Sequence, residues 1–578
     1  MKNTRLRLKI AGESGQGVNS VGELLAKACK RSGYFVFGYR EYPSLIKGGY
    51  ANYQIDIAAQ SIQSSSKNVD IAVCLSRRSV HEVLDSIDEG GVLIHWVSNF
   101  HFSQEEEERI RDKAIHVEFI DVKKIITEHK GKKIMVNTFF IGLVWGMIKQ
   151  DFSILEQAFK EEFGKRRDIL DKNIELLSVG FEYQSNIDKQ IQKIDILVPQ
   201  ESQKESLLLS GNQAIALGAI ASGVRAYYAY PMTPASSILS YLSKTYHSTG
   251  ILVKQAEDEI TAAQMTLGSM HMGTRALVAT SGGGFDLMTE TLSLAMITEI
   301  PFVCVVAQRP GPATGVPTWT AAADLNLALY AGHGESSRCV LAASDVISAY
   351  TLTQHAFNIA ERYQIPVILL TEKQIAESLF NCSSLPEPIE IERGLTKPDG
   401  ITASDRFKLT ETGVSPRWLP GQSDQTYNAN SDEHVEHGKL TERADDVRAM
   451  MEKRMKKQTA LLNEFPDPIL YGEEEGDMLF VGWGSPKNTM VDVISYIQNG
   501  NSKKKISYLH YEYIYPLKAE WLLKLSQQFK KSVVVEQNYQ SQFGKLVRME
   551  TGFEFNDRLL KYDGRPFFIE DILDYISE

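Results

Sequence analysis

The feature that most restricts the fold of this chain is a repeated alternation of short apolar segments with longer stretches of helical spacing. It occurs in three separate runs, at residues 6–120, 211–371 and 478–536. The short segments, rich in Val, Ile and Leu and bounded by Gly or polar residues, predict strands, and the stretches between them predict helices. Strands that alternate with helices form parallel sheets covered on both faces. We therefore predict an α/β fold with three doubly wound domains.

Two polar stretches separate these runs. One is short and predicts a linker, whereas the other contains no strand pattern and ends in one charged helical segment. The longer stretch is expected to be an ordered inter-domain crossing or an arm that contacts a partner. The predicted boundaries are 1–183 for the first domain, 184–204 for the linker, 205–385 for the second domain, 386–465 for the connection and 466–578 for the last domain.

Composition excludes several classes of protein. The 578 residues exceed what one core supports, and a net charge of −11 argues against a nucleic-acid binder. No apolar run approaches the roughly 20 residues of a membrane span, and no signal peptide opens the chain, so a cytoplasmic protein is expected. No two of the five cysteines have CxxC spacing, so we predict neither a metal site nor an iron–sulfur cluster on this chain.

A glycine-rich turn follows the first predicted strand. Gly12, Ser14, Gly15 and Gly17 belong to it, and its backbone N–H groups could hold an anion such as a phosphate. The ordinary alternative is a tight strand-to-helix turn that needs glycine for its backbone angles. Its spacing matches neither the dinucleotide nor the Walker pattern. A second glycine-containing segment, residues 41–50, is expected to form a loop over the same strand ends.

Four unusual loops follow successive predicted strands of the second domain, at residues 230–236, 255–259, 280–285 and 308–318. Three of them have an ordinary explanation: a Thr–Pro helix start, acids in a first helical turn and a solvated arginine. Ligands bind at the carboxyl ends of strands in open α/β sheets. Four such loops at one edge therefore outline a single crevice.

These motifs resemble those of the 2-oxoacid:ferredoxin oxidoreductases. That family carries a YPITP-type motif, then a thiamine-contacting Glu, then a QR-x-G-P-[ST]-T-G-x-P-T loop. The corresponding segments here are YPMTPAS at 230–236, QAEDE at 255–259 and QRPGPATGVPT at 308–318. GESGQGV and EYPSLIKGG resemble the family's γ domain, fused ahead of α as in 2-oxoglutarate-type enzymes. GVSPRWLPG (413–421), EHVEHGKLTE (433–442) and VVVEQNYQSQFGKL (533–546) also match, so the resemblance covers nearly the whole chain.

The resemblance assigns roles to individual residues. Thr233 and Arg309 would bind the 2-oxoacid, with Thr318 assisting, and Glu257 would hold the aminopyrimidine of thiamine diphosphate. The acids that compete with Glu257 are Asp258 and Glu259. The residues that would lie against the cofactor are Tyr230 and Pro231. The departures from the family pattern are Lys47, Met232, Ala235 and Ala313, and none removes a group with a chemical role.

The implied reaction is the coenzyme A-dependent oxidative decarboxylation of a 2-oxoacid, with electrons passed to ferredoxin. The resemblance favours 2-oxoglutarate as the substrate, which would give succinyl-CoA. Pyruvate, branched-chain and aryl 2-oxoacids stay open as substrates, and so does a non-catalytic scaffold. The chain lacks a cysteine cluster and the family's GDG-type motif, so a β subunit would carry the [4Fe–4S] cluster, Mg²⁺ and the diphosphate. An (αβ)2 heterotetramer is expected, in which the 12–17 loop helps to cover coenzyme A. The last domain resembles the C-terminal domain of transketolase-like enzymes.

Overall fold

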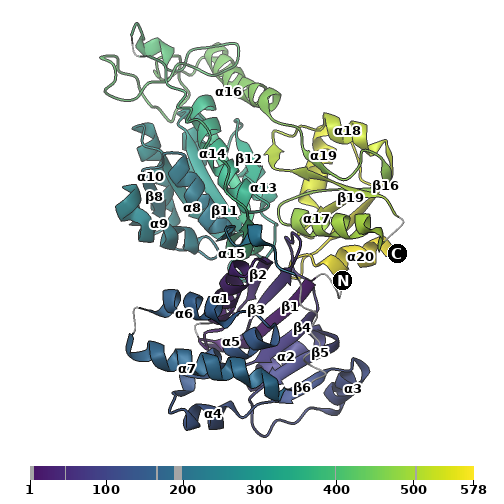
Figure 1. The fold of residues 1–578 in the computed structure, drawn as a ribbon. Helices are drawn as coiled ribbons and strands as arrows, with labels where there is room; N and C mark the ends of the chain where they lie inside the picture. Colours follow the sequence, from purple (N-terminus) through teal and green to yellow (C-terminus); the bar gives the residue numbers. More distant parts are fainter. Residues whose placement is uncertain are drawn as a thin grey trace. The chain divides into compact units, whose positions relative to one another are not determined.

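The computed structural model describes residues 5–45, 47–164, 167–187, 198–397, 399–501 and 504–577 (Figure 1). The chain divides into two compact units. The first comprises Met1–Leu209, Ser378–Ser384 and Phe568–Glu578, and the second comprises Ser210–Glu377 and Leu385–Phe567. The central part of the predicted linker, residues 188–197, lies outside the described residues.

The first unit contains an eight-stranded mixed sheet in the order β6-β5-β4-β1-β3-β2-β14-β7. Strands β1, β4, β5 and β6 are mutually parallel, and β3 runs antiparallel to both β1 and β2. The strands are β1 (Arg5–Ser14), β2 (Phe35–Glu41), β3 (Gly48–Ala58), β4 (Val69–Cys74), β5 (Ile87–His95), β6 (His116–Phe119), β7 (Leu207–Ser210) and β14 (Leu379–Cys382). The helices are α1 (Val18–Arg31), α2 (Arg77–Val83), α3 (Gln104–Asp112), α4 (Val122–Glu128), α5 (Val136–Met147), α6 (Phe152–Phe163), α7 (Arg167–Tyr183) and α20 (Ile569–Ser577).

The hairpin of β2 and β3 corrects the expectation for residues 41–50, because the end of this segment begins a strand and is not all loop. Strand β3 was missed because its alternate residues Asn52, Gln54 and Asp56 are polar although they are buried. The Asp56 carboxylate accepts hydrogen bonds from the Arg5 guanidinium at 3.2 Å and from the Gln54 amide at 2.9 Å. A strand whose buried side chains are polar and have charged or hydrogen-bonded partners therefore lacks the apolar pattern of a core strand.

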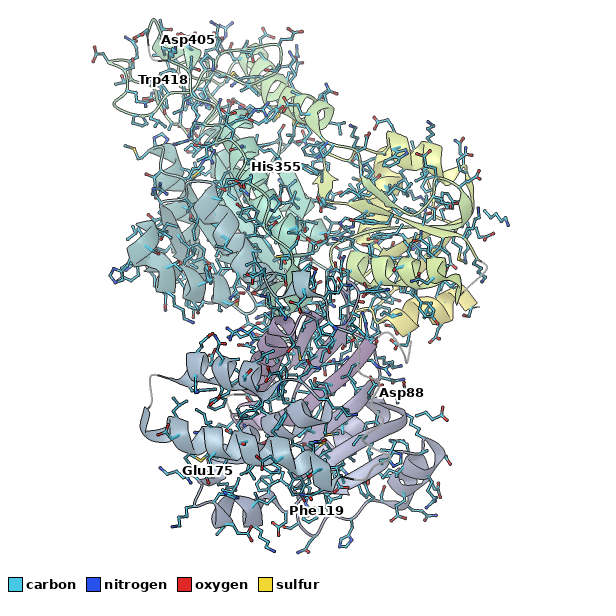
Figure 2. All side chains as sticks on the ribbon, in the orientation of Figure 1. Asp88, Phe119, Glu175, His355, Asp405 and Trp418 are labelled. Carbon is cyan, nitrogen blue, oxygen red and sulfur yellow. The ribbon has the colours of Figure 1, made fainter. Side chains whose placement is uncertain are left out.

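Strand β1, which pairs with β3, also carries buried charged residues. Leu6, Leu8 and Ile10 alternate with buried cationic residues and pack into the apolar core of the unit. Arg7 is paired with Asp70 at 2.6 Å and with Asp88, labelled in Figure 2, at 2.8 Å. These ion pairs satisfy the charges that the sheet buries.

The second unit begins with a seven-stranded sheet in the order β18-β12-β13-β11-β10-β8-β9, parallel except for β18. Its central strand β11 is buried along its whole length. The strands are β8 (Ala226–Ala229), β9 (Leu252–Gln255), β10 (Ala276–Thr280), β11 (Phe302–Gln308), β12 (Cys339–Ala342), β13 (Pro366–Glu372) and β18 (Tyr513–Tyr515). Strand β18 comes from the last part of the sequence, so the last predicted domain completes this sheet.

Helices cover this sheet on two sides. On one side α8 packs between α9 and α14, and on the other α10 packs against α11 and α12. A Cβ at Gly218 of α8 would lie 2.5 Å from the carbonyl of Tyr350, which explains the small residues of α8. The helices are α8 (Gly211–Ala221), α9 (Ser236–Thr249), α10 (Glu259–His271), α11 (Gly282–Leu287), α12 (Thr289–Ile297), α13 (Leu325–Tyr330), α14 (Val346–Tyr363) and α15 (Lys373–Glu377).

An ordered arm, residues 385–465, follows this domain and ends in α16 (Ala444–Glu464). Trp418, labelled in Figure 2, is 2% exposed and lies in the arm. Buried ion pairs fasten the arm to the preceding helices. Glu361 of α14 accepts from Arg417 at 3.2 Å, and Glu299 lies 2.5 Å from both Lys453 and Lys457 of α16. The motif at 413–421 therefore supplies a structural anchor through Arg417.

The last part of the chain forms a five-stranded sheet in the order β15-β17-β16-β19-β20, parallel except for β15. Its three central strands, β17, β16 and β19, match those that the apolar pattern predicts at 505–509, 478–482 and 532–536. The strands are β15 (Ile469–Tyr471), β16 (Gly476–Trp483), β17 (Ile506–Tyr511), β19 (Phe529–Glu536) and β20 (Asp557–Leu560), and the helices are α17 (Pro486–Tyr496), α18 (Glu520–Ser526) and α19 (Gln542–Thr551). The predicted fold class, α/β with three largely parallel sheets, is confirmed.

Candidate active site

The four unusual loops of the second domain all leave one edge of the seven-stranded sheet. Strands β9, β8, β10 and β11 are consecutive neighbours in that sheet and run parallel. Their carboxyl ends carry the loops at 255–259, 230–236, 280–285 and 308–318, in that order. This edge is where ligands bind in open α/β sheets.

Two of the sequence-predicted residues meet directly at this edge. Nη1 of Arg309 donates a hydrogen bond of 2.8 Å to the carbonyl of Thr233. Arg309 is only 9% exposed, and burial lowers the pKa of its guanidinium while the charge of Asp324 acts in the opposite direction. Within the described part of the chain, Nε and Nη2 of Arg309 have no hydrogen-bond partner. The guanidinium is thus fixed at one nitrogen and open at the others.

The remaining residues of the two loops differ in exposure. Thr318 is buried and Thr233 is half-buried. Tyr230 is 40% exposed and Pro231 is also exposed, so both present their rings at the surface of the loop. Thr233 and Pro234 are joined by a cis peptide bond.

The three consecutive acids after β9 point in different directions. Glu257 is exposed and accepts a hydrogen bond of 3.3 Å from the Thr261 hydroxyl. Asp258 caps α10, accepting from the Thr261 N–H at 2.7 Å. Glu259 is only 5% exposed, and a Cβ at Gly284 would lie 2.9 Å from its Oε1.

This geometry favours Glu259 over Glu257 as the acid that faces the cofactor. The functional role requires a carboxylate that faces inward, and the exposed Glu257 does not meet that requirement. Because Asp258 is the N-cap, Glu259 is the first helical residue, and it lies against the loop after β10. Glu259 is therefore the better candidate for the cofactor-contacting acid.

The loop after β10 adds two free hydroxyls beside Glu259. The Oγ1 of Thr280 and the Oγ of Ser281 are buried and have no hydrogen-bond partner within the described residues. Gly283 has open space at its Cβ position, whereas Gly284 lies against Glu259. Buried polar atoms of this kind need a partner, which water or a polar ligand can supply. An inward carboxylate with two hydroxyls and a glycine wall fits the aminopyrimidine of thiamine diphosphate, which offers both donors and acceptors.

Sequence reasoning missed Asp324, which lies at the same edge. Its backbone N–H donates to Oε1 of Gln308 at 2.9 Å, and a Cβ at Gly282 would overlap its carboxyl group. Burial and the charge of Asp286 raise the pKa of Asp324 to about 6, against the opposing effect of Arg309. The available signal was weak: Asp324 is the first acid after the 308–318 motif and precedes a helix.

The glycine loop of the first unit is a tight strand-to-helix turn. Strand β1 continues to Ser14, and Gly15 and Gly17 have φ values of 92° and 78°. Such angles favour glycine, which supports the ordinary alternative. The Ser14 hydroxyl donates to the carbonyl of Leu45 at 3.1 Å, so it is already engaged within the loop. Gly12 has no room for a side chain because Gln16 packs against it.

Among the described residues, no cluster of three or more His, Cys, Asp or Glu side chains has an arrangement that could hold a metal ion. The five cysteines are buried and none is joined to another in a disulfide, and burial raises the pKa of Cys29 and of Cys74 to about 12. The helices in the described ranges include none with the length and apolar character needed to span a membrane.

Comparisons with known proteins agree with this architecture. Residues 7–183 match the family described as pyruvate ferredoxin/flavodoxin oxidoreductase, and residues 217–455 match its thiamine-diphosphate-binding domain. The chain is 31% identical to the 2-oxoacid:ferredoxin oxidoreductase subunit alpha of a Sulfolobus species, over 98% of this chain and 96% of that one. It is 26% identical to the 2-oxoglutarate oxidoreductase subunit KorA of Mycobacterium tuberculosis, over 98% of this chain and 90% of the relative.

A solved structure extends the comparison to three dimensions. The 2-oxoglutarate:ferredoxin oxidoreductase from Magnetococcus marinus, with 2-oxoglutarate, coenzyme A and succinyl-CoA bound, superposes with a TM-score of 0.92. It is 28% identical in sequence, and the match covers 99% of each chain. The chain therefore belongs to the family of 2-oxoacid:ferredoxin oxidoreductases, thiamine-diphosphate-dependent enzymes, as an alpha subunit.

Proposed function

We propose that this alpha subunit oxidatively decarboxylates 2-oxoglutarate to succinyl-CoA and passes the electrons to ferredoxin through a β subunit. The observation that carries the proposal is the Arg309 guanidinium, fixed by the Thr233 carbonyl at the strand edge where Glu259 faces inward. The order of the fused first and second domains and the full-length likeness to a 2-oxoglutarate enzyme support this substrate.

Arg309 is the proposed anchor for the substrate carboxylate. Its Nε and Nη2 can donate two parallel hydrogen bonds to a carboxylate, an arrangement that fixes both position and orientation. The hydroxyl of Thr233 lies in the loop to which Arg309 is bound, where it can donate to the keto oxygen. Thr318 belongs to the same stiff loop as Arg309 and is proposed to assist.

Thiamine diphosphate, when bound, supplies the carbon nucleophile and the electron sink that decarboxylation requires. Glu259 is proposed to hold the proton shared with the cofactor's ring nitrogen, a role given to Glu257 from the sequence alone. Its burial keeps water away from that carboxylate, which strengthens the hydrogen bond. Thr280 and Ser281 are proposed to bind polar atoms of the cofactor, and Tyr230 and Pro231 to border its ring.

The rest of the active site is proposed to come from a β subunit in an (αβ)2 heterotetramer. The five cysteines of this chain are dispersed, and a [4Fe–4S] cluster needs four thiolates close together. Mg²⁺ and the diphosphate of the cofactor are assigned to the same partner. Coenzyme A is the proposed acyl acceptor, and the turn with Gly12, Ser14, Gly15 and Gly17 is proposed to help cover it. The proposed domains are 1–183, 205–385 and 466–578, although β7, β14 and α20, at the edges of the last two, belong to the first compact unit.

The test uses the complex reconstituted with its β subunit, coenzyme A and a dye as electron acceptor. Replacing Arg309 with Ala should raise the KM for 2-oxoglutarate about a hundredfold or more, because a bidentate charged contact is lost. The KM for coenzyme A serves as the internal reference and should change less than twofold. An unchanged KM for 2-oxoglutarate would favour a non-catalytic scaffold.

A substrate panel separates the alternatives within the class. The wild-type complex should show its highest kcat/KM with 2-oxoglutarate, compared with pyruvate, branched-chain and aryl 2-oxoacids. A higher value for one of these would replace 2-oxoglutarate as substrate and leave the proposed chemistry intact.

A further inference from the structure

The segment that follows the substrate loop, residues 320–326, is hydrogen-bonded along its backbone to the C-terminal domain. The Ala322 N–H donates to the carbonyl of Gln537 at 2.9 Å, and the Asn538 side-chain amide donates to the carbonyl of Ala322 at 3.1 Å. Gln542 makes two such bonds: its Nε2 donates to the carbonyl of Ala323 at 2.7 Å, and its Oε1 accepts from the Asn326 N–H at 2.9 Å. These partners lie in the VVVEQNYQSQFGKL motif.

The residues that make these contacts are themselves held rigidly. Asn538 is 2% exposed and Gln542 is 7% exposed. The buried carboxylate of Glu536 accepts five hydrogen bonds and so fixes the turn between β19 and α19. The donors are Trp483 Nε1, Asn538 Nδ2, Ser541 Oγ, Phe543 N and Gly544 N, at 2.8–3.3 Å.

A short path leads from these contacts to the substrate anchor. Asp324 lies between Ala323 and Asn326, and its N–H is bound by Oε1 of Gln308, the residue that precedes Arg309. The other end of the Gln308 side chain donates to the carbonyl of Thr371 at 3.3 Å. A shift of residues 322–326 would therefore be transmitted to the backbone that carries Arg309.

We propose that Asn538 and Gln542 of the C-terminal domain are positioning residues that set the place of Arg309 and thereby the affinity for the 2-oxoacid. The proposal rests on the proposed role of Arg309 in binding substrate. It gives a function to the motif at 533–546, which neither the catalytic edge nor the cofactor explains. Neither residue touches the reacting atoms, so the effect acts through the loop.

The competing explanation is that Asn538 and Gln542 only hold the second domain and the C-terminal domain together. The chain offers a matched control for it. The Asn488 side-chain amide of α17 donates to the carbonyl of Ser344 at 2.7 Å, which is also a buried hydrogen bond between the same two domains. Ser344 follows β12, so this contact does not involve residues 308–326. Asn488→Ala should therefore weaken the domain contact without affecting substrate affinity.

The first measurement is hydrogen exchange on the purified full chain, which needs neither partner nor turnover. In Gln542→Ala, the amides of residues 322–326 should exchange at least tenfold faster than in the wild type, because two buried hydrogen bonds to this segment are lost. In Asn488→Ala these amides should exchange at the wild-type rate. Equal protection of residues 322–326 in Gln542→Ala and wild type would overturn the proposal.

The second measurement is steady-state kinetics of the reconstituted complex with 2-oxoglutarate and coenzyme A. Gln542→Ala should raise the KM for 2-oxoglutarate about tenfold, with kcat and the KM for coenzyme A changed less than threefold. Gln542→Glu keeps the acceptor for the Asn326 N–H and loses the donor to Ala323. Its KM for 2-oxoglutarate should lie between those of the wild type and Gln542→Ala. A fall in kcat at constant KM, as expected for Asn488→Ala, would indicate adhesion alone and would refute the positioning role.

The double variant Arg309→Ala/Gln542→Ala separates this proposal from the proposed function. Without Arg309 the contact has no anchor to position, so the double variant should have the KM of Arg309→Ala alone. Independent effects of the two substitutions would contradict the positioning role. If Arg309→Ala alone leaves the KM unchanged, the proposed function fails, whatever Gln542→Ala shows in hydrogen exchange.

Discussion

Glu361 should be the residue on which the attachment of the arm depends most strongly. Its carboxylate is fully buried and accepts from three guanidinium groups, those of Arg275 at 2.7 Å, Arg393 at 2.8 Å and Arg417 at 3.2 Å. Replacement with Gln keeps the shape but removes the negative charge that these three guanidinium groups share. Arg275 and Arg417, each at most 3% exposed, would then lose the carboxylate that they share.

The magnitude follows from that uncompensated charge. Removing one partner of a buried ion pair costs about 3–5 kcal/mol, because the remaining charge stays out of water. For a unit of several hundred residues, each kcal/mol lowers the melting temperature by about 2 °C. Glu361→Gln should therefore melt about 6–10 °C below the wild type.

The assay is thermal unfolding of the full chain followed by circular dichroism, together with limited proteolysis at a temperature below the transition. Cleavage should appear first between residues 386 and 442, where the arm depends on Arg417 and Arg393. Glu387→Gln is the matched control, since Glu387 is an exposed acid of the same arm. A melting temperature within 1 °C of the wild type for Glu361→Gln would refute the reasoning.

Three further predictions concern the active site and the arm. Glu259→Gln should lower kcat of the reconstituted complex about 10²–10⁴-fold, whereas Glu257→Gln should change it less than threefold; the reverse order would restore Glu257 as the cofactor-contacting acid. Asp324 has a pKa of about 6, so its charge should compete for the substrate-anchoring guanidinium as pH rises through 6. The KM for 2-oxoglutarate should rise across that interval, and a pH profile of Asp324→Asn should be flat there. Burial and neighbouring cations lower the pKa of Lys457 to about 8. Between pH 8 and 10.5 the unfolded chain therefore binds more protons than the folded chain, so the free energy of unfolding should rise with pH in that window. Urea titrations should show this rise in the wild type relative to Lys457→Met.

The parts of the fold that sequence predicted best are those in which burial and apolar character coincide. The apolar pattern predicts strands at 302–307 and 366–371 and a helix at 211–221. Strands β11 and β13 each extend one residue further, and α8 has the predicted bounds. Strand β3 was missed because Asn52 and Asp56 are buried with polar partners. Strand β18 was missed because Tyr513–Tyr515 is short and pairs with β12, more than 170 residues earlier in the chain. Local pattern carries no information about such pairing.

In the candidate site, too, some features could be predicted from the sequence and others could not. The sequence predicted that the loops carrying Thr233 and Arg309 share an edge, because the carboxyl ends of parallel strands must do so. It did not select Glu259, because choosing among three adjacent acids requires the rotational phase of α10. That phase was partly available, since an Asp is a preferred N-cap and Asp258 takes that position. Asp324 had only a weak signal in the sequence, because only the folded loop brings it to Gln308.

The family motifs outside the catalytic edge are polar, and their contacts explain why. The arm is fastened through Arg417 and the C-terminal domain through Gln542, in each case by hydrogen bonds of buried polar groups. An apolar interface of similar area would also hold the domains together, but it would tolerate sliding, since the hydrophobic effect has no direction. A hydrogen bond of buried groups is lost when the partners shift by about 1 Å, so it fixes register as well as contact. The proposed role of Arg309 needs that accuracy, because a carboxylate anchor must be held within about 0.5 Å of its productive position. Polar motifs are therefore what accurate positioning of the loop that carries Arg309 would require.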